Sequence, residues 1–255
     1  MRAFNGLIAA ASAAVILGTQ LGSARAAEIK LLSTIAMQSA IKELAPKFEK
    51  QSGHKLAPTF GLGVAMAKRV ADGEAADVVI ALRGGVDGLV KDGKVGSDVT
   101  LARSGIGVAV RKGSPKPDIS TAEALKRTLL AAKSISYSDP AFGGASGVHF
   151  AKVIERLGIA EQLKPKTKYP PEAGSAGELL VKGDVDLAVQ QIPELQEVTG
   201  TELVGPLPGD LQNITVFAAA IPAKAKEPNA AKAFIQFLQT PEAVAVIKEK
   251  GLEPG

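Results

Sequence analysis

Short apolar runs alternate with amphipathic stretches along most of this chain. Residues 77–82 are apolar after the first position, which is typical of a strand buried on both faces. Residues 37–48 instead carry apolar side chains three or four positions apart, which predicts a helix that ends near Gly53. The same criteria predict strands at 28–33, 55–60, 77–82, 104–110, 134–137, 167–169, 185–191 and 214–221, and helices at 37–52, 65–72, 121–133, 148–157, 229–238 and 241–250, with shorter helices ending at 89 and 181.

The alternation of strands and helices favours a parallel α/β sheet. The strand–helix units are too numerous for one small sheet. We therefore expect two α/β lobes with a ligand cleft between them. Strands 104–110 and 214–221 are the candidates for the segments that cross between the lobes. This division assigns residues 27–105 and 219–255 to lobe I and residues 106–218 to lobe II.

The first 26 residues have the pattern of a secretory signal peptide. Arg2 supplies a positive start, residues 7–21 are mostly apolar, and Ala24-Arg25-Ala26 is a small-x-small cleavage signal. The apolar run is shorter than the roughly 20 residues that a membrane helix needs. We therefore expect cleavage near Ala26 and export of the mature chain; a retained anchor is the alternative.

Composition narrows the possible partners. The chain has no Cys, which excludes disulfides and thiolate metal ligands. Its formal net charge is +4, and the two arginines of the predicted signal peptide account for half of it. A nearly neutral mature chain, with aromatic residues at 4% and no basic tract, is not typical of nucleic-acid-binding proteins. The slight positive excess is compatible with a small anionic ligand.

Residues 138–148 form a glycine-rich connection between a predicted strand and a predicted helix. The first N–H groups of a helix have no partners inside it, and the helix dipole places partial positive charge there. Glycines at 143, 144 and 147 would let a ligand approach this backbone closely. The stretch is therefore either an anion cradle or a tight turn before a capped helix.

Three other strand-to-helix loops also carry glycine or hydroxyl residues, at 33–37, 61–65 and 174–177. Ligands of open α/β sheets bind at the carboxyl ends of strands, where such loops lie. Two loops from each lobe would surround an anion with N–H groups, which favours the cradle. The candidate ligand-binding residues are Thr34, Ala36, Met37, Gly63, Arg83, Ser146, Gly147, Gly174, Ser175 and Gln191.

Few side chains near these loops are charged or strongly polar. Arg83 follows a buried strand, where its guanidinium either pairs with a carboxylate or oxyanion or lies on the surface. Arg103 allows the same two interpretations. Gln190 and Gln191 end a predicted strand, so one of the two amides should point into the surrounding structure. His149, near a helix start, is more typical of a packed or solvated residue than of a ligand-binding one.

The side chains do not indicate an enzyme. A Ser–His–Asp site needs a histidine close to the serine, and the chain has two histidines, His54 and His149. Ser146 lacks the second glycine of a nucleophile elbow because position 148 is Val. No His, Asp or Glu cluster has metal-ligand spacing. We expect no catalysis, no cofactor and no metal; a secreted enzyme that uses Ser146 is an alternative.

Four segments match a known family in order and spacing, at 39–49, 75–81, 150–158 and 233–243. On these segments the chain resembles the periplasmic molybdate-binding-like family, the solute receptors of bacterial ABC importers. The resemblance spans nearly the whole mature chain and implies a type II periplasmic binding protein, with two α/β lobes, two crossing strands and closure around the ligand. It also implies a periplasmic protein, which we expect to be a monomer, that delivers a small anionic solute to a membrane permease.

The family's molybdate site does not carry over in full. Where the family has serines in the first and second loops, this sequence has Ala36 and Gly63. The family's tyrosine at a strand end falls near Gln191. Main-chain donors can persist at Ser146 and Gly174, whereas the serine and tyrosine hydroxyls are lost.

Arg83 is a further departure, because the family commonly has an acidic residue near this position. Lost hydroxyls and a gained arginine favour an organic di- or tricarboxylate over molybdate. Molybdate or tungstate held by main-chain donors is the alternative. The ligand-sensing domain of a transcription factor can share this fold, but the export signal and the lack of a DNA-binding segment oppose it.

Overall fold

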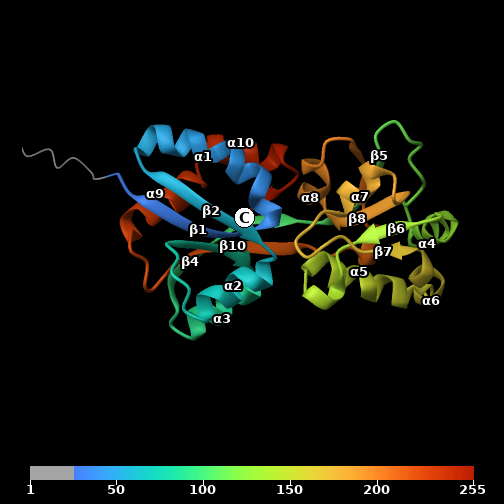
Figure 1. Ribbon diagram of the computed structural model, residues 1–255, viewed down its shortest axis with the longest axis horizontal. Coiled ribbons are helices and arrows are strands. Elements are labelled where there is room, and N and C mark those ends of the chain that lie inside the picture. Colours follow the sequence, from blue (N-terminus) through green and yellow to red (C-terminus); the bar gives the residue numbers. More distant parts are fainter. Residues whose placement is uncertain (1–25) are drawn as a thin grey trace, which may run out of the picture.

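The computed structural model describes residues 26–255, so nearly all of the predicted signal peptide lies outside the described part of the chain. Two α/β lobes lie side by side (Figure 1). Each lobe is built on its own sheet, which confirms the predicted two-lobed architecture. Within residues 26–255, no helix has the length and apolar character needed to span a bilayer.

Lobe I contains a six-stranded mixed sheet. Its strands, in order across the sheet, are β11 (Glu253–Pro254), β4 (Val95–Ser104), β10 (Thr215–Pro222), β3 (Val78–Leu82), β1 (Glu28–Thr34) and β2 (Lys55–Gly61). β1 pairs in parallel with β2 and β3, but β10 runs antiparallel to both β3 and β4. The expectation of a parallel sheet was wrong for β10, because the chain re-enters lobe I from lobe II without a helical crossover.

Helices cover both faces of this sheet (Figure 1). One layer consists of α1 (Gln38–Ser52), α9 (Pro228–Phe237) and α10 (Pro241–Glu249), and the other of α2 (Gly63–Ala71) and α3 (Arg83–Lys91). Along β3, Val78 and Ile80 pack against the first layer, whereas Val79 and Ala81 pack against the second. Alternate side chains of a strand point to opposite faces, so burial on both sides explains the continuous apolar run.

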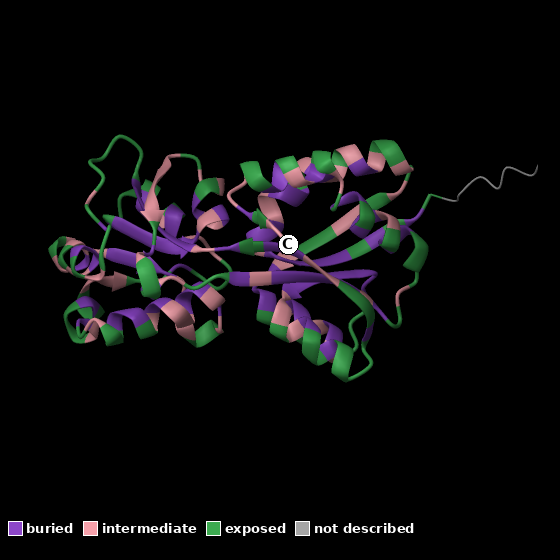
Figure 2. Cartoon of the chain, turned by 180° about the vertical axis from the view of Figure 1, so that it is seen from behind, coloured by how far each residue is buried: buried purple, intermediate pink, exposed green. Residues whose placement is uncertain are grey.

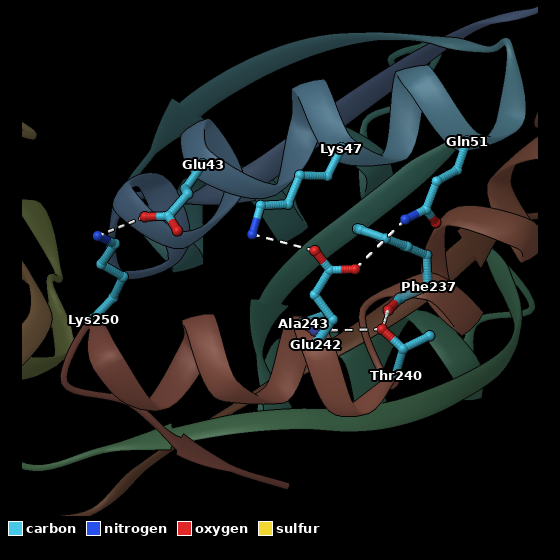
Figure 3. A network of polar contacts seen from close by, with 8 residues as sticks. All are labelled: Glu43, Lys47, Gln51, Phe237, Thr240, Glu242, Ala243 and Lys250. Carbon is cyan, nitrogen blue, oxygen red and sulfur yellow. Dashed lines mark hydrogen bonds and ion pairs between the residues drawn. The ribbon is translucent and has the colours of Figure 1, made fainter.

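α10 lies along α1, with polar contacts on the outside (Figure 3). Lys250 pairs with Glu43 at 2.7 Å, and Lys47 pairs with Glu242 at 3.3 Å. These side chains are partly or largely exposed, so the two pairs contribute little to stability. The fully buried Phe234 of α9 belongs to the apolar core that α1 and α10 share.

Lobe II contains a five-stranded sheet with helices on both faces. Its strands, in order, are β7 (Thr167–Lys168), β6 (Ile135–Tyr137), β8 (Leu187–Gln191), β5 (Ile106–Arg111) and β9 (Thr201–Pro206). α4 (Ala122–Ala131), α5 (Ala145–Arg156) and α6 (Ala160–Leu163) pack on one face, and α7 (Ala176–Lys182) and α8 (Ile192–Glu197) on the other. Short 3-10 turns are η1 (Ile35–Met37), η2 (Pro140–Phe142), η3 (Lys164–Lys166) and η4 (Gly209–Leu211). In both lobes the central strands, β1, β3 and β10 in lobe I and β5, β6 and β8 in lobe II, are mostly buried between partly exposed helices (Figure 2).

The chain crosses between the sheets twice. The first crossing is at Gly105, between β4 and β5, and the second is at residues 207–214, between β9 and β10. Gln212 joins the two crossings, because its Oε1 accepts from the Ile106 N–H and its Nε2 donates to the Ile106 carbonyl, both at 2.9 Å. The lobe boundary predicted between residues 218 and 219 falls inside β10, which lies wholly in the sheet of lobe I.

The elements β4, β9, β11, α6 and α8 were not predicted from the sequence. β4 and β9 are largely exposed or half-buried, so neither carries the continuous apolar run that identified the other strands. α8 has six residues, which is too short for a helical apolar period to appear. The missed elements matter, because α8 carries residues that line the cleft described below.

Asp77 generates a prediction about stability. This residue is 3% exposed, and its carboxylate accepts from the N–H groups of Lys30 at 2.9 Å, Lys226 at 2.7 Å and Glu227 at 2.9 Å. Replacement by Ala leaves these N–H groups without that acceptor, so Asp77→Ala should lower the free energy of unfolding by about 3 kcal/mol in denaturant titrations. The exposed Asp72→Ala control should change it by less than about 0.5 kcal/mol, and equal effects of the two variants would contradict the prediction.

Candidate functional site

The carboxyl ends of strands from both lobes meet at one pocket, here called the inner pocket. Thr34 ends β1 and Leu82 ends β3 in lobe I, and Gln191 ends β8 in lobe II. The residues that line the inner pocket are Thr34, Ile35, Leu62, Gly63, Leu82, Ser138, Gly144, Ala145, Ser146, Gln191, Glu194 and Phe217. The pocket thus lies between the lobes, at the sheet edge where α/β proteins bind ligands.

Three α-helices begin at the inner pocket without a side-chain cap. α2 and α3 come from lobe I and α5 from lobe II, and their N-cap residues are Leu62, Leu82 and Gly144. Away from this pocket, α4 and α10 are capped by the hydroxyls of Thr121 and Thr240, whereas α6 and α9 begin without a side-chain cap. Uncapped helix starts offer N–H donors and partial positive charge, so this pocket suits an anion.

α8 also begins at this pocket but contributes differently. The N–H of Ile192 donates to the Gly105 carbonyl at 3.0 Å, and the next residue, Pro193, has no N–H. The start of α8 therefore presents mainly side chains to the pocket, those of Gln191 and Glu194.

A close backbone contact fixes the start of α5. A Cβ atom on Gly147 would lie 2.1 Å from the Ser138 carbonyl oxygen, so this position admits only glycine without movement of the backbone. The contact holds the first turn of α5 against the end of β6. Glycine is therefore needed at position 147 for packing and not for ligand contact. Gly144 and Ser146, in the same stretch, line the pocket.

The two glutamines at the end of β8 have different roles. Gln190 accepts from the Ala176 N–H at 2.8 Å and donates to the Gly174 carbonyl at 3.3 Å, which holds the start of α7. Gln191 lines the inner pocket and donates to Oγ1 of Thr215 at 2.8 Å. Among the described residues, its buried Oε1 has no hydrogen-bond partner. Because the Thr215 hydroxyl can also donate, the Gln191 amide can turn and offer its NH₂ group to a ligand.

Glu194 is the one ionisable residue among the described residues that line the inner pocket. It also borders a second, more polar pocket, here called the outer pocket. The outer pocket is lined by Ile35, Gln38, Lys42, Ala173, Gly174, Ser175, Glu178, Gln190, Glu194, Glu197 and Val198. Glu194 therefore lies on the wall between the two pockets.

The pKa of Glu194 lies above the usual range for a glutamate. The residue is half-buried. This burial raises the pKa of Glu194 to about 8; a hydrogen bond with Gln190 acts in the opposite direction, and the charge of Glu197 adds to the rise. At neutral pH the group is therefore mostly protonated and can donate a hydrogen bond.

The lobes touch beside the outer pocket. Nε2 of Gln38 donates to Oε1 of Glu197 at 2.9 Å, and Nζ of Lys42 approaches the same oxygen at 3.1 Å. α1 of lobe I is thus bridged to α8 of lobe II. Lys42 is well exposed, so the bridge favours contact of the lobes only weakly.

The structure brings six of the ten predicted site residues together. Thr34, Gly63, Ser146 and Gln191 line the inner pocket, and Gly174 and Ser175 line the outer pocket. The other four predicted residues, Ala36, Met37, Gly147 and Arg83, are not among the lining residues. The first two are buried in the apolar core of lobe I.

Arg83 lies at the start of α3 with its guanidinium bound inside lobe I. It forms ion pairs with Asp87 and Asp98, and its Nη2 donates to Oγ1 of Thr100 at 2.8 Å. The structure therefore does not bring Arg83 to the inner pocket. Arg103, on β4, donates to the Pro254 carbonyl at 3.5 Å, also away from the cleft.

Sequence reasoning missed Glu194 and the apolar lining residues. A usable signal for Glu194 was the order Gln191-Ile192-Pro193-Glu194, in which a strand end is followed by Pro at a favoured first-turn position. Within residues 26–255, no group of three or more His, Asp or Glu residues could hold a metal ion. His149 contacts the Leu211 carbonyl at 2.8 Å and does not line either pocket.

Comparisons with known proteins agree with this architecture. Residues 29–253 match the model of a family described as bacterial extracellular solute-binding protein. The chain is 36% identical over 234 residues to an aconitate isomerase of a Pseudomonas species, covering 89% of this chain and 87% of that protein. It is 29% identical over 235 residues to the molybdate-binding protein ModA of Azotobacter vinelandii, covering 90% and 91%. The solved periplasmic molybdate-binding protein of A. vinelandii is 21% identical with a TM-score of 0.71, covering 88% of this chain and 98% of that one.

The raised pKa of Glu194 predicts a pH-dependent stability difference. Between about pH 4.5 and pH 8, the folded chain keeps a proton on Glu194 that the unfolded chain releases. The free energy of unfolding of the wild type should therefore fall, relative to Glu194→Gln, as the pH rises through this window. Denaturant titrations of the ligand-free proteins at a series of pH values measure the difference.

A matched control is Glu123→Gln, which changes an exposed glutamate in the first turn of α4. Its stability difference from the wild type should not change by a comparable amount over the same pH window. A difference between wild type and Glu194→Gln that is constant from pH 5 to pH 8 would contradict the assignment of a raised pKa to Glu194.

Proposed function

This chain belongs to the bacterial extracellular solute-binding proteins, and we propose that its solute is an organic di- or tricarboxylate, bound in the inner pocket. In this proposal the protein, after removal of its signal peptide, works in the periplasm and delivers the anion to the permease of an ABC importer. The observation that carries the proposal is the convergence of the uncapped starts of α2, α3 and α5 on one pocket.

The lining of the inner pocket favours an organic anion over a simple oxyanion. Ile35, Leu62, Leu82 and Phe217 are apolar and line the pocket beside the helix starts. Such side chains can pack against the carbon skeleton of a polycarboxylate, whereas a tetrahedral oxyanion has no apolar part to bury. The relative at 36% identity is named for aconitate, a tricarboxylate, and this similarity supports the same ligand class here.

The protonated carboxyl of Glu194 is compatible with this ligand. A neutral carboxyl can donate a hydrogen bond to a carboxylate oxygen, and the Gln191 amide can donate another. A ligand that touches both lobes binds the closed form more tightly than the open form and shifts the population toward closure. The contact of Gln38 and Lys42 with Glu197 would add to closure on the same side.

Isomerisation of a bound aconitate is the second candidate function. Two observations favour it: the name of the 36% identical relative, and a titratable carboxyl in the wall of the pocket. No catalysis was expected from the sequence, because it has neither the pattern of a nucleophile nor that of a metal cluster. An isomerisation by proton transfer needs neither of them.

The proposal predicts the ligand selectivity of the protein. Isothermal titration of protein that has been unfolded, dialysed and refolded should show micromolar or tighter binding of citrate, cis-aconitate or trans-aconitate. Molybdate, tungstate and sulfate should bind far more weakly, because they gain nothing from the apolar lining. Tight binding of molybdate without any response to polycarboxylates would support the alternative ligand and contradict the proposal.

Gln191→Leu tests the position of the site. The substitution keeps much of the side-chain volume but removes a donor to the ligand, so affinity should fall at least about tenfold. Gln51→Leu, on an exposed position of α1, should leave affinity unchanged. Thermal unfolding of both variants checks that they are folded, and an unchanged affinity of folded Gln191→Leu would remove this side chain from the site.

A further inference from the structure

Glu194 is an unexpected residue for a pocket that only holds anions. No Lys or Arg is among the described residues that line the inner pocket, so an ionised Glu194 would repel a bound polycarboxylate without a fixed cation to offset it. A glutamine could donate a hydrogen bond equally well without this repulsion. Unlike the amide of glutamine, a carboxyl at this position can release a proton to the ligand and take one from it.

The position of Glu194 suits movement of a proton. The residue lines both the inner pocket, where the ligand is proposed to bind, and the polar outer pocket. The charged groups that face it across the outer pocket are Lys42, Glu178 and Glu197. Glu194 can therefore exchange its proton with water through the outer pocket and still reach the ligand.

We propose that Glu194 transfers a proton between two carbon atoms of an unsaturated polycarboxylate in the inner pocket, and so shifts the double bond by one position. The inference rests on the proposed binding of a polycarboxylate there. It assigns a catalytic residue to the second candidate function. For aconitate, the shifted double bond can form with either geometry, so the cis and trans isomers interconvert.

This proton transfer requires no oxidant, reductant or metal. Ionised Glu194 removes a proton from the methylene carbon next to the double bond, and the electron pair of that C–H bond forms the new double bond. The electron pair of the old double bond moves to the far carbon and is delocalised into the carboxylate attached to it. Protonated Glu194 then returns the proton to the far carbon, which regenerates the ionised carboxyl.

The surrounding structure supports both halves of this step. The uncapped starts of α2, α3 and α5 can stabilise the negative charge that develops on the ligand carboxylates. Burial raises the pKa of Glu194 to about 8, which makes it a stronger base than an exposed glutamate and brings its titration near neutral pH.

Glu194→Gln separates proton transfer from binding. The wild type and Glu123→Gln should interconvert cis- and trans-aconitate, followed by NMR of the substrate. Glu194→Gln should bind trans-aconitate with an affinity within about threefold of the wild type, because the amide keeps the shape and a hydrogen-bond donor. Its kcat should fall by at least about 100-fold, because general acid–base catalysis contributes on that order.

A second measurement covers the case in which Glu194→Gln does not fold. The kcat of the wild type should rise with pH through a value near or above 8, where Glu194 becomes the base. A kcat that is flat across this range, or a folded Glu194→Gln with wild-type turnover, would overturn the role of Glu194.

Failure of this inference is distinguishable from failure of the proposed function. If the wild type binds polycarboxylates but does not interconvert the aconitate isomers, Glu194 is not a proton-transfer residue and the binding function stands. If neither isomer nor citrate binds, the proposed function fails and this inference fails with it.

Discussion

The organisation of this molecule depends on the hydrogen bonds of the backbone N–H groups at its helix starts. The first N–H groups of a helix need acceptors from outside the helix. In α4 and α10 a threonine hydroxyl provides one, whereas α2, α3 and α5 receive no such cap and open on the same pocket. The parallel strands that precede these helices place their starts at one edge of each sheet. A bound anion would supply the hydrogen-bond acceptors that side chains do not provide at α2, α3 and α5. The three helices can reach one ligand only when the two lobes are in contact.

A second constraint is that no Lys or Arg lines the inner pocket among residues 26–255 to balance the charge of an anion. Arg83, which directly follows the lining residue Leu82, is held by Asp87 and Asp98 inside lobe I. The inner pocket therefore depends on N–H groups, amides and hydroxyls, and the one titratable residue among the described residues that line it is an acid. In a family of solute-binding proteins, a single buried carboxyl beside the ligand is a small change that can add proton chemistry to binding. The similarity to an aconitate isomerase and to a molybdate-binding protein agrees with one architecture serving different anions.

Much of the fold could be predicted from local patterns. The two lobes, most strands and the family resemblance were correct, because buried strands and amphipathic helices leave clear periods in the sequence. Thr34, Gly63, Ser146 and Gln191 lie at strand ends or in strand-to-helix loops, and their place at the inner pocket follows from this topology. The expectation of parallel strands was wrong for β10 and also for β5, which runs antiparallel to β8 and β9, because each direction depends on how the chain passes between the lobes.

The position of Arg83 and the importance of Glu194 depend on contacts that local patterns do not contain. The partner Asp98 lies on β4, a strand without a clear apolar period, so the ion pair that holds Arg83 could not be anticipated. Glu194 lies in the six-residue helix α8, and its raised pKa results from burial, which depends on the tertiary structure. Binding of an anion at the helix starts of both lobes is tested most directly by NMR of backbone amides during titration with trans-aconitate. We expect the largest shifts at Gly63 and Val64 of α2 and at Ala145 and Ser146 of α5. Shifts confined to other surfaces, with these four amides unchanged, would contradict binding at this place.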